Sequence, residues 1–162
     1  MAKLPKNYYT DKIKKFNVSQ TETGYKLSLD YIPLGIKLDK AQDALDDAVW
    51  DSVQKRMPVM TGDLKSRTNA INVNERGQVF LYDPESDYGH YQYEGKVYVD
   101  PITGKGAFYS PEYGFWSRPG AEKVPSDRPL TYSQPNAVPH WGEVSIQEDQ
   151  NKWLEVVKRA LK

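Results

Sequence analysis

The stretch Met57-Pro-Val-Met-Thr-Gly-Asp-Leu64 decides how the middle of this chain folds, because it stops one helix and starts another. Pro58 lacks a backbone N–H and its ring clashes with the preceding turn, so a helix cannot run through it. Thr61 is a residue type that caps helices, and Asp63 follows in the first turn, where a carboxylate favours the helix dipole. The stretch therefore predicts a helix–turn–helix connection with an architectural role and no chemistry.

A second informative segment, Tyr88-Gly-His-Tyr-Gln-Tyr-Glu-Gly95, is rich in tyrosine, and we expect residues 87–94 to form an irregular or helical turn. Tyrosine combines a large, semi-rigid ring with a hydroxyl edge, which suits packing and protein–protein contacts. The candidate subunit contacts are accordingly aromatic: Trp50, Tyr88, Tyr91, Tyr93, Tyr113 and Trp116.

Composition limits the classes of protein that this chain can represent. At 162 residues it is long enough for one domain with a real core, and its formal net charge is zero. A neutral chain is unsuited to general nucleic-acid binding, which depends on neutralising phosphates. The chain has no cysteine, which excludes disulfides and thiolate chemistry. Without an apolar leader or a run of membrane-spanning length, a soluble protein with no membrane partner is expected.

Charge is unevenly spread along the chain, although it sums to zero. Residues 1–26 contain six lysines against Asp11 and Glu22, whereas the expected helix that follows is rich in aspartate. Two interpretations remain open at this point. The charges form two solvated faces, or they form complementary surfaces that meet in a symmetric assembly or a stacked ring.

The first third of the chain predicts an arm, a hairpin and a long helix. Residues 1–12 look like a flexible basic arm. Apolar and polar side chains alternate over residues 16–18 and 25–31, which predicts a hairpin that ends at Pro33 and Gly35. A helix is expected over 39–57. Its apolar stripe, at three- and four-residue spacing, consists of Ala41, Leu45, Ala48, Val49, Ser52 and Val53.

The remaining elements predict an α+β fold. A short helix after Thr61 is followed by expected strands at 70–73 and 78–82, and by a hairpin of 96–99 with 107–110. Residues 101–140 hold seven of the eleven prolines, which indicates a long loop or arm, with a short strand at 130–132. A last helix follows Pro139, with one face formed by Ile146, Trp153, Val156, Val157, Ala160 and Leu161.

These elements together give a small, mostly antiparallel sheet packed against a long helix in the N-terminal half and a C-terminal helix. We expect residues 1–37 to form an N-terminal extension and 38–162 a single domain with the long loop 101–140.

Residues for catalysis or cofactor binding do not stand out. The only histidines, His90 and His140, lie in unrelated contexts, and the chain has neither a nucleophile elbow nor a phosphate-binding loop. Acidic residues in 83–94 occupy some positions of a calcium-binding loop, but Tyr88 stands where the sharp turn needs glycine, so a polar turn is favoured. We therefore expect no enzyme activity, no catalytic residues, no cofactor and no metal.

The order of the motifs resembles the minor capsid and tail-completion proteins of the head–tail neck of long-tailed bacteriophages. The matching features are the helix that ends in Met57–Leu64, the segment Tyr88–Gly95, His140-Trp-Gly and Asn151-Lys-Trp-Leu154. The resemblance covers roughly residues 38–162. The N-terminal hairpin, the basic arm and the long proline-rich segment depart from the simplest members of that family.

The resemblance implies a structural protein of the virion neck, assembled in the host cytoplasm. Its implied partners are other copies of itself in a ring and adjacent neck, connector, tail tube or terminator proteins. Contact with DNA passing through the ring would be sequence-independent and weak. We expect the N-terminal arm and residues 101–136 to contact other subunits or the next ring. The alternative is a carbohydrate-binding or host-surface module that uses Tyr109, Tyr113, Phe115 and Trp116.

Overall fold

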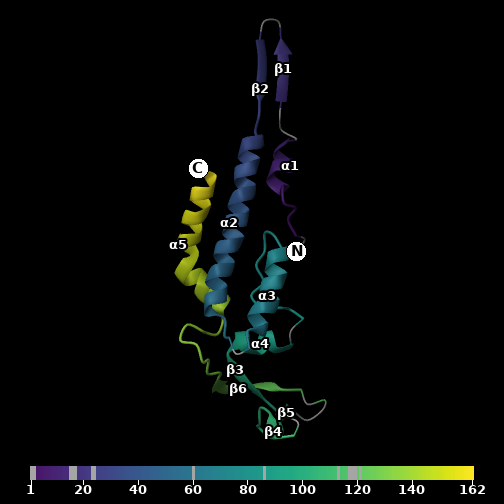
Figure 1. The fold of residues 1–162 in the computed structure, drawn as a ribbon, viewed down its shortest axis with the longest axis vertical. Coiled ribbons are helices and arrows are strands. Elements are labelled where there is room, and N and C mark those ends of the chain that lie inside the picture. Colours follow the sequence, from purple (N-terminus) through teal and green to yellow (C-terminus); the bar gives the residue numbers. More distant parts are fainter. Residues whose placement is uncertain are drawn as a thin grey trace.

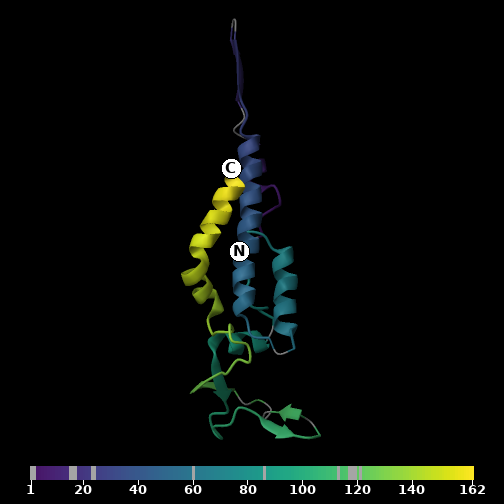
Figure 2. The same cartoon turned by 60° about the vertical axis from the view of Figure 1, so that its left-hand side comes forward.

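The computed structural model describes residues 3–14, 18–22, 25–59, 61–85, 87–112, 114–116, 120 and 122–162. It has the expected α+β class, and its elements follow the chain as α1 Tyr8–Lys14, β1 Val18–Glu22, β2 Tyr25–Leu29, α2 Ile32–Arg56, α3 Asp63–Asn74, α4 Asp87–Glu94, β3 Lys96–Val99, β4 Phe108–Ser110, β5 Gly114–Trp116, β6 Val124–Pro129 and α5 Trp141–Leu161. The molecule is slender: β1 and β2 extend from one end of a helical body, and the other strands lie at the opposite end (Figure 1, Figure 2).

The long helix α2 begins at Ile32, seven residues before the predicted start at Asp39. The hairpin ends at Leu29, ahead of Pro33 and Gly35, but both of these residues belong to α2. Pro33 lies in the first turn of the helix, where its missing N–H costs no hydrogen bond. The expected domain boundary after residue 37 falls inside this helix. At the other end, Met57 is extended with φ −71° and ψ 139°, which confirms the stop before Pro58.

The core lies where α2, α3, α4 and the start of α5 meet. Its buried members are Trp50, Val53, Met57, Leu64, Tyr93 and Trp141. Of the stripe predicted on α2, Val53 lies in this core and Val49 packs against it, and Ala41 and Ser52 are also buried. The face predicted on α5 is partly wrong, because Ile146 is 54% exposed and Leu161 37% exposed. Ser145 and Asp149 are buried on α5 instead.

The strands predicted at 70–73 and 78–82 are absent from the described structure. Residues 70–73 continue α3. The side-chain amide of Asn72 donates from Nδ2 to the Phe80 carbonyl at 3.0 Å, and its Oδ1 accepts a hydrogen bond from Phe80 N at 2.7 Å. Because this amide replaces a strand partner, residues 78–82 remain irregular. Val79, Leu81 and Tyr82 still pack against the core.

The described strands form three separate antiparallel pairs: β1 with β2, β3 with β6 and β4 with β5. The N-terminal hairpin is confirmed with shifted bounds, although Thr23 and Gly24 lie outside the described residues. The predicted pairing of 96–99 with 107–110 was wrong, because β3 pairs with β6. The strand expected at 130–132 was also wrong, since β6 ends at Pro129.

Candidate interaction surfaces

The segment Met57–Leu64 connects helices as predicted, with a different capping residue. Gly62 is the N-cap of α3 and adopts the left-handed region at φ 84°, so Thr61 is not the cap. Asp63 lies in the first turn, as expected. Met57 and Leu64 are buried on either side of the turn, which fixes both helices to the same core.

A glutamine from the proline-rich segment holds this turn in place. Gln134 Oε1 accepts a hydrogen bond from Val59 N at 2.9 Å, and its Nε2 donates to the Val59 carbonyl. Val138 N also donates to the Arg56 carbonyl, at 3.2 Å. The end of the long loop is therefore attached to the helix–turn–helix connection.

The tyrosine-rich segment forms α4 and contributes Tyr93 to the interior. The Tyr93 ring meets the Trp141 ring edge to face, with centroids 4.8 Å apart and planes at 88°. Its hydroxyl donates to Glu143 Oε2, and this hydrogen bond holds the pKa of Glu143 below its ordinary value. Burial, together with the same carboxylate, raises the pKa of Tyr93. The pair joins α4 to the first turn of α5.

The other candidate contacts occupy different environments. Trp50 is a core residue whose Nε1 donates to Asn69 Oδ1 at 2.8 Å. Tyr91 is 39% exposed and packs edge to face on Tyr98, with centroids 4.4 Å apart. Tyr88 lies in α4 and Trp116 ends β5, while Tyr113 lies outside the described residues. The structure brings Trp50 and Tyr93 together in one core, and subunit contact by these six residues remains a prediction.

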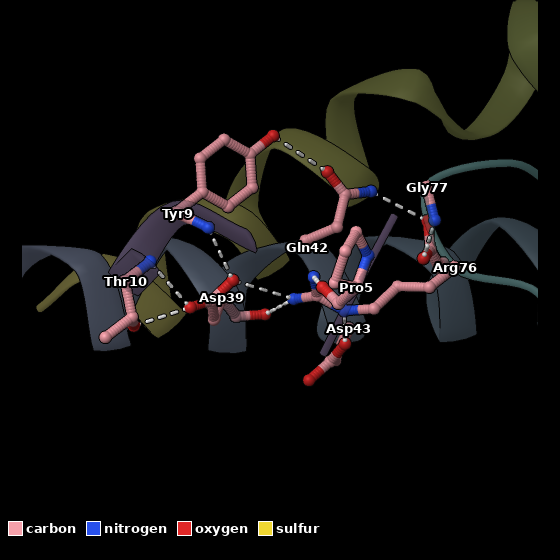
Figure 3. A network of polar contacts seen from close by, with 9 residues as sticks. Pro5, Tyr9, Thr10, Asp39, Gln42, Asp43, Arg76 and Gly77 are labelled. Carbon is pink, nitrogen blue, oxygen red and sulfur yellow. Dashed lines mark hydrogen bonds and ion pairs between the residues drawn. The ribbon is translucent and has the colours of Figure 1, made fainter. Parts of the chain in front are cut away.

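The N-terminal segment is attached to α2 by a buried polar network that sequence reasoning missed (Figure 3). The Asp39 carboxylate accepts hydrogen bonds from Thr10 N at 3.0 Å, Thr10 Oγ1 at 2.6 Å and Tyr9 N at 3.1 Å. Burial alone would raise the pKa of Asp39, but these hydrogen bonds and the nearby Arg76 hold it below the ordinary value. The start of α1 is thereby capped by a side chain of α2.

Arg76 extends the network to the loop after α3. Its Nη1 donates to the Pro5 carbonyl at 2.8 Å, its Nη2 to the Asp39 carbonyl at 2.6 Å, and its Nε to Asp43 Oδ1 at 2.5 Å. The described part of the predicted flexible arm is therefore ordered against the body. Part of the aspartate-rich face of α2 is occupied within the chain itself.

An apolar groove lies between α2, residues 77–81 and α5. It has a volume of about 420 Å³, and its apolar lining comes from Leu45, Val49, Val53, Val79, Leu81, Ile146 and Trp153. The charged residues that line it are Asp46 and Glu143, and no described lysine or arginine lines it. The lining of the groove is thus mostly apolar, with two carboxylates that accept hydrogen bonds from Gln42, Gly77 and Tyr93.

Metal ligation and membrane insertion receive no support from the described residues. They contain no cluster of three or more His, Cys, Asp or Glu residues that could hold a metal ion. Asp83, which begins the segment that resembles a calcium-binding loop, forms a salt bridge with Arg67, with Arg67 Nη2 2.6 Å from Asp83 Oδ2. None of the described helices combines the length and apolarity needed to cross a bilayer.

The chain was also compared with known proteins. Protein-family models, curated proteins and solved structures gave no match.

Proposed function

We propose that this chain is a structural protein of the head–tail neck of a long-tailed bacteriophage. In this role it acts as a minor capsid or tail-completion protein, forms a ring with other copies of itself and joins adjacent connector or tail proteins. It performs no catalysis. Its place is the virion, after assembly in the host cytoplasm.

The observation that carries this proposal is the distribution of strands at opposite ends of a helical body. The pair β1–β2 lies at one end and β4–β5 at the other, and the helices lie between them (Figure 1). The main contacts of each pair are between its own two strands. Paired strands that extend beyond their own core can add to a neighbour's surface or sheet edge, as assembly proteins require.

The motifs that suggested the family also have structural roles that suit this function. Met57–Leu64 and Tyr93 hold the core together, and Trp141 is fully buried at 0% exposure. Its Nε1 donates to the Leu81 carbonyl at 2.8 Å. These residues stabilise the scaffold that carries the two ends, which supports an architectural role.

Loss of the protein during phage growth tests the proposal. In the phage that encodes the chain, a stop codon at Lys3 should give filled heads and separate tails that fail to join. Supplying the intact chain in trans should restore joined particles, and mass spectrometry should then detect it in purified virions. Complete, infectious particles that lack the chain would refute a neck role. Binding of the isolated monomer to glycans would favour the host-surface alternative.

A further inference from the structure

Helix α5 buries polar residues and exposes apolar ones. It lies at the edge of the helical body and packs mainly on α2 (Figure 1, Figure 2). Ser145 and Asp149 are buried beside Arg56 of α2, whereas Ile146 is 54% and Leu154 55% exposed. Single exposed apolar residues need no explanation, but several that gather on one face mark an interaction site.

The exposed apolar residues of α5 do share one face. Ile146, Trp153, Val157 and Leu161 follow one another at intervals of seven, four and four residues, and Leu154 lies beside them. Such intervals bring side chains onto the same side of a helix. These five residues, which we call the α5 stripe, cover about 23 Å at the rise of an α-helix. None of them is fully buried.

The α5 stripe continues into the apolar groove between α2, residues 77–81 and α5. Ile146 and Trp153 belong to both surfaces, and the groove adds Leu45 and Val49 from α2. Helices pack by fitting side chains of one helix into the grooves of the other. The stripe therefore has a hollow beside it that can accept side chains from a second helix.

The charges on the striped side of α5 differ between its two ends. Glu143 lies in the first turn, three residues before Ile146, and Lys158 lies in the last turn, three residues before Leu161. Lys158 Nζ is 2.8 Å from Glu155 Oε1, but both side chains are more than half exposed, and surface pairs of this kind are weak. Lys158 can therefore exchange this partner for another carboxylate.

The other acidic residues near the α5 stripe are occupied within the chain. Glu148 and Asp149 form ion pairs with Arg56 at 2.5 Å and 2.7 Å. Across the groove, Asp46 accepts a hydrogen bond from Gly77 N at 2.7 Å. The charges at the two ends of the stripe therefore set the orientation of a helix that packs on it.

The α5 stripe is complementary to itself when two copies of α5 run antiparallel. Ile146 of one copy then lies opposite Leu161 of the other, and the two Leu154 side chains meet near the middle. Glu143 of each copy comes to the end of the stripe where the other copy carries its lysine. A parallel pair would instead bring like charges together at both ends, which is unfavourable.

We propose that two copies of this chain associate through their α5 stripes, packed antiparallel about a two-fold axis near Leu154. Both copies use the same surface, as a two-fold contact requires. The contact covers the residues that α5 leaves exposed. Because it joins copies in pairs and closes no ring, it goes beyond the proposed function and is independent of it.

Light scattering of the full-length chain over a range of concentrations tests the association. The natural chain should form dimers, and Leu154→Glu should raise the Kd of the pair at least about tenfold, because two carboxylates would meet at the axis. Val73→Glu makes the same kind of change at an apolar residue of α3 that is 74% exposed, so it is the matched control and should leave the Kd unchanged. A natural chain that stays monomeric would overturn the proposal.

The absence of cysteine from the chain makes the orientation testable as well. Full-length Ile146→Cys and Leu161→Cys variants are oxidised separately and as a mixture, and Leu154→Cys is oxidised alone. A disulfide needs Cα atoms about 4.4–6.8 Å apart. In the antiparallel pair the two Ile146 positions are about 23 Å apart along the helices, so that variant cannot join itself. Val73→Cys measures random collision.

The antiparallel contact predicts that the mixture and Leu154→Cys form disulfides about tenfold faster than Ile146→Cys, Leu161→Cys or Val73→Cys alone, because only the first two bring their Cα atoms within about 7 Å. Equal rates throughout would overturn the contact, and fast self-joining of Ile146→Cys would overturn its orientation. If the chain is present in the virion neck but this pattern is absent, the α5 contact fails and the proposed function stands. The reverse result removes the function and keeps the contact.

Discussion

Asp39 illustrates how one carboxylate can anchor a whole segment. It is 6% exposed, and it accepts three hydrogen bonds from Tyr9 and Thr10 while Arg76 lies beside it. A buried ion pair whose partner is removed costs about 3–5 kcal/mol, because an uncompensated charge remains. The network is therefore sensitive to the loss of any one member.

The pH dependence of stability follows from the same residue. The folded-state pKa of Asp39 lies below its ordinary value, as do those of Glu143 and Asp149. Such groups stabilise the fold above their unfolded pKa, and this stability is lost as pH falls through the folded pKa. We expect the free energy of unfolding, from denaturant titration, to fall between about pH 5 and pH 2.

Asp39→Asn tests the contribution of this carboxylate. The free energy of unfolding of the variant at pH 7 should be about 3 kcal/mol lower than that of the natural chain. Below about pH 5, it should also fall less steeply with decreasing pH. Asp47→Asn, at an exposed position of the same helix, is the control and should leave both quantities unchanged. An unaltered acid slope in Asp39→Asn would contradict the assigned role.

Sequence reasoning recognised residue types better than their partners. It singled out Trp50 and Tyr93 as aromatic candidates, but it could not show that both lie inside the core. Asp39 was seen only as one of several aspartates, because Arg76 is distant along the chain and a single pattern does not reveal a pair. Asp83, one of the acidic residues that match positions of a calcium-binding loop, forms a salt bridge with Arg67 that the sequence pattern does not predict.

At the scale of elements, helical periodicity was the reliable signal. The stripe on α2 and the existence of α5 followed from apolar spacing, and Pro58 gave the end of α2. Strand predictions failed where they assumed local pairing. The backbone of Phe80 is hydrogen-bonded by the side chain of Asn72, and β3 pairs with β6 across an intervening hairpin. The first outcome depends on a side-chain contact that strand periodicity does not show, and the second on a pairing between strands distant in sequence.

The packing of α1 on α2 depends on the smallest residue at its closest point. A Cβ added to Gly35 would lie 2.6 Å from Thr10 Cα, which is backbone and cannot rotate away. Alanine in a helix gains about 1 kcal/mol over glycine in propensity, whereas overpacking costs about 1–3 kcal/mol. Moving α1 would also weaken the bonds to Asp39, so the unfavourable effect dominates.

We therefore expect Gly35→Ala to destabilise the protein by about 2 kcal/mol and to release α1. Limited trypsin digestion should cut after Lys12 and Lys14 faster than in the natural chain. Gly106→Ala is the matched control, because its added Cβ would meet nothing closer than 3.4 Å. Equal digestion of the two variants would show that α1 is not held by this contact.

At the scale of the whole molecule, the N-terminal network supports the extended hairpin. The chain enters the hairpin from α1 and leaves it into α2, and these two helices are joined through Asp39 and Gly35. The class of fold was predictable from sequence, but this slender arrangement was not, because it depends on the long-range contacts of Arg76 and Thr10.

Removal of the hairpin tests whether it contributes to self-association or to the stability of the fold. Replacing residues 18–29 with a short Gly-Ser turn should leave Tm within about 2 °C of the natural chain, because the hairpin adds little to the core and 1 kcal/mol corresponds to about 2–4 °C at this size. Far-ultraviolet circular dichroism and thermal unfolding measure this directly, with Gly35→Ala as the destabilised comparison. Light scattering of the same sample should show loss of association beyond the pair of copies joined through α5. A fall in Tm of more than about 5 °C would instead make the hairpin part of the folding core.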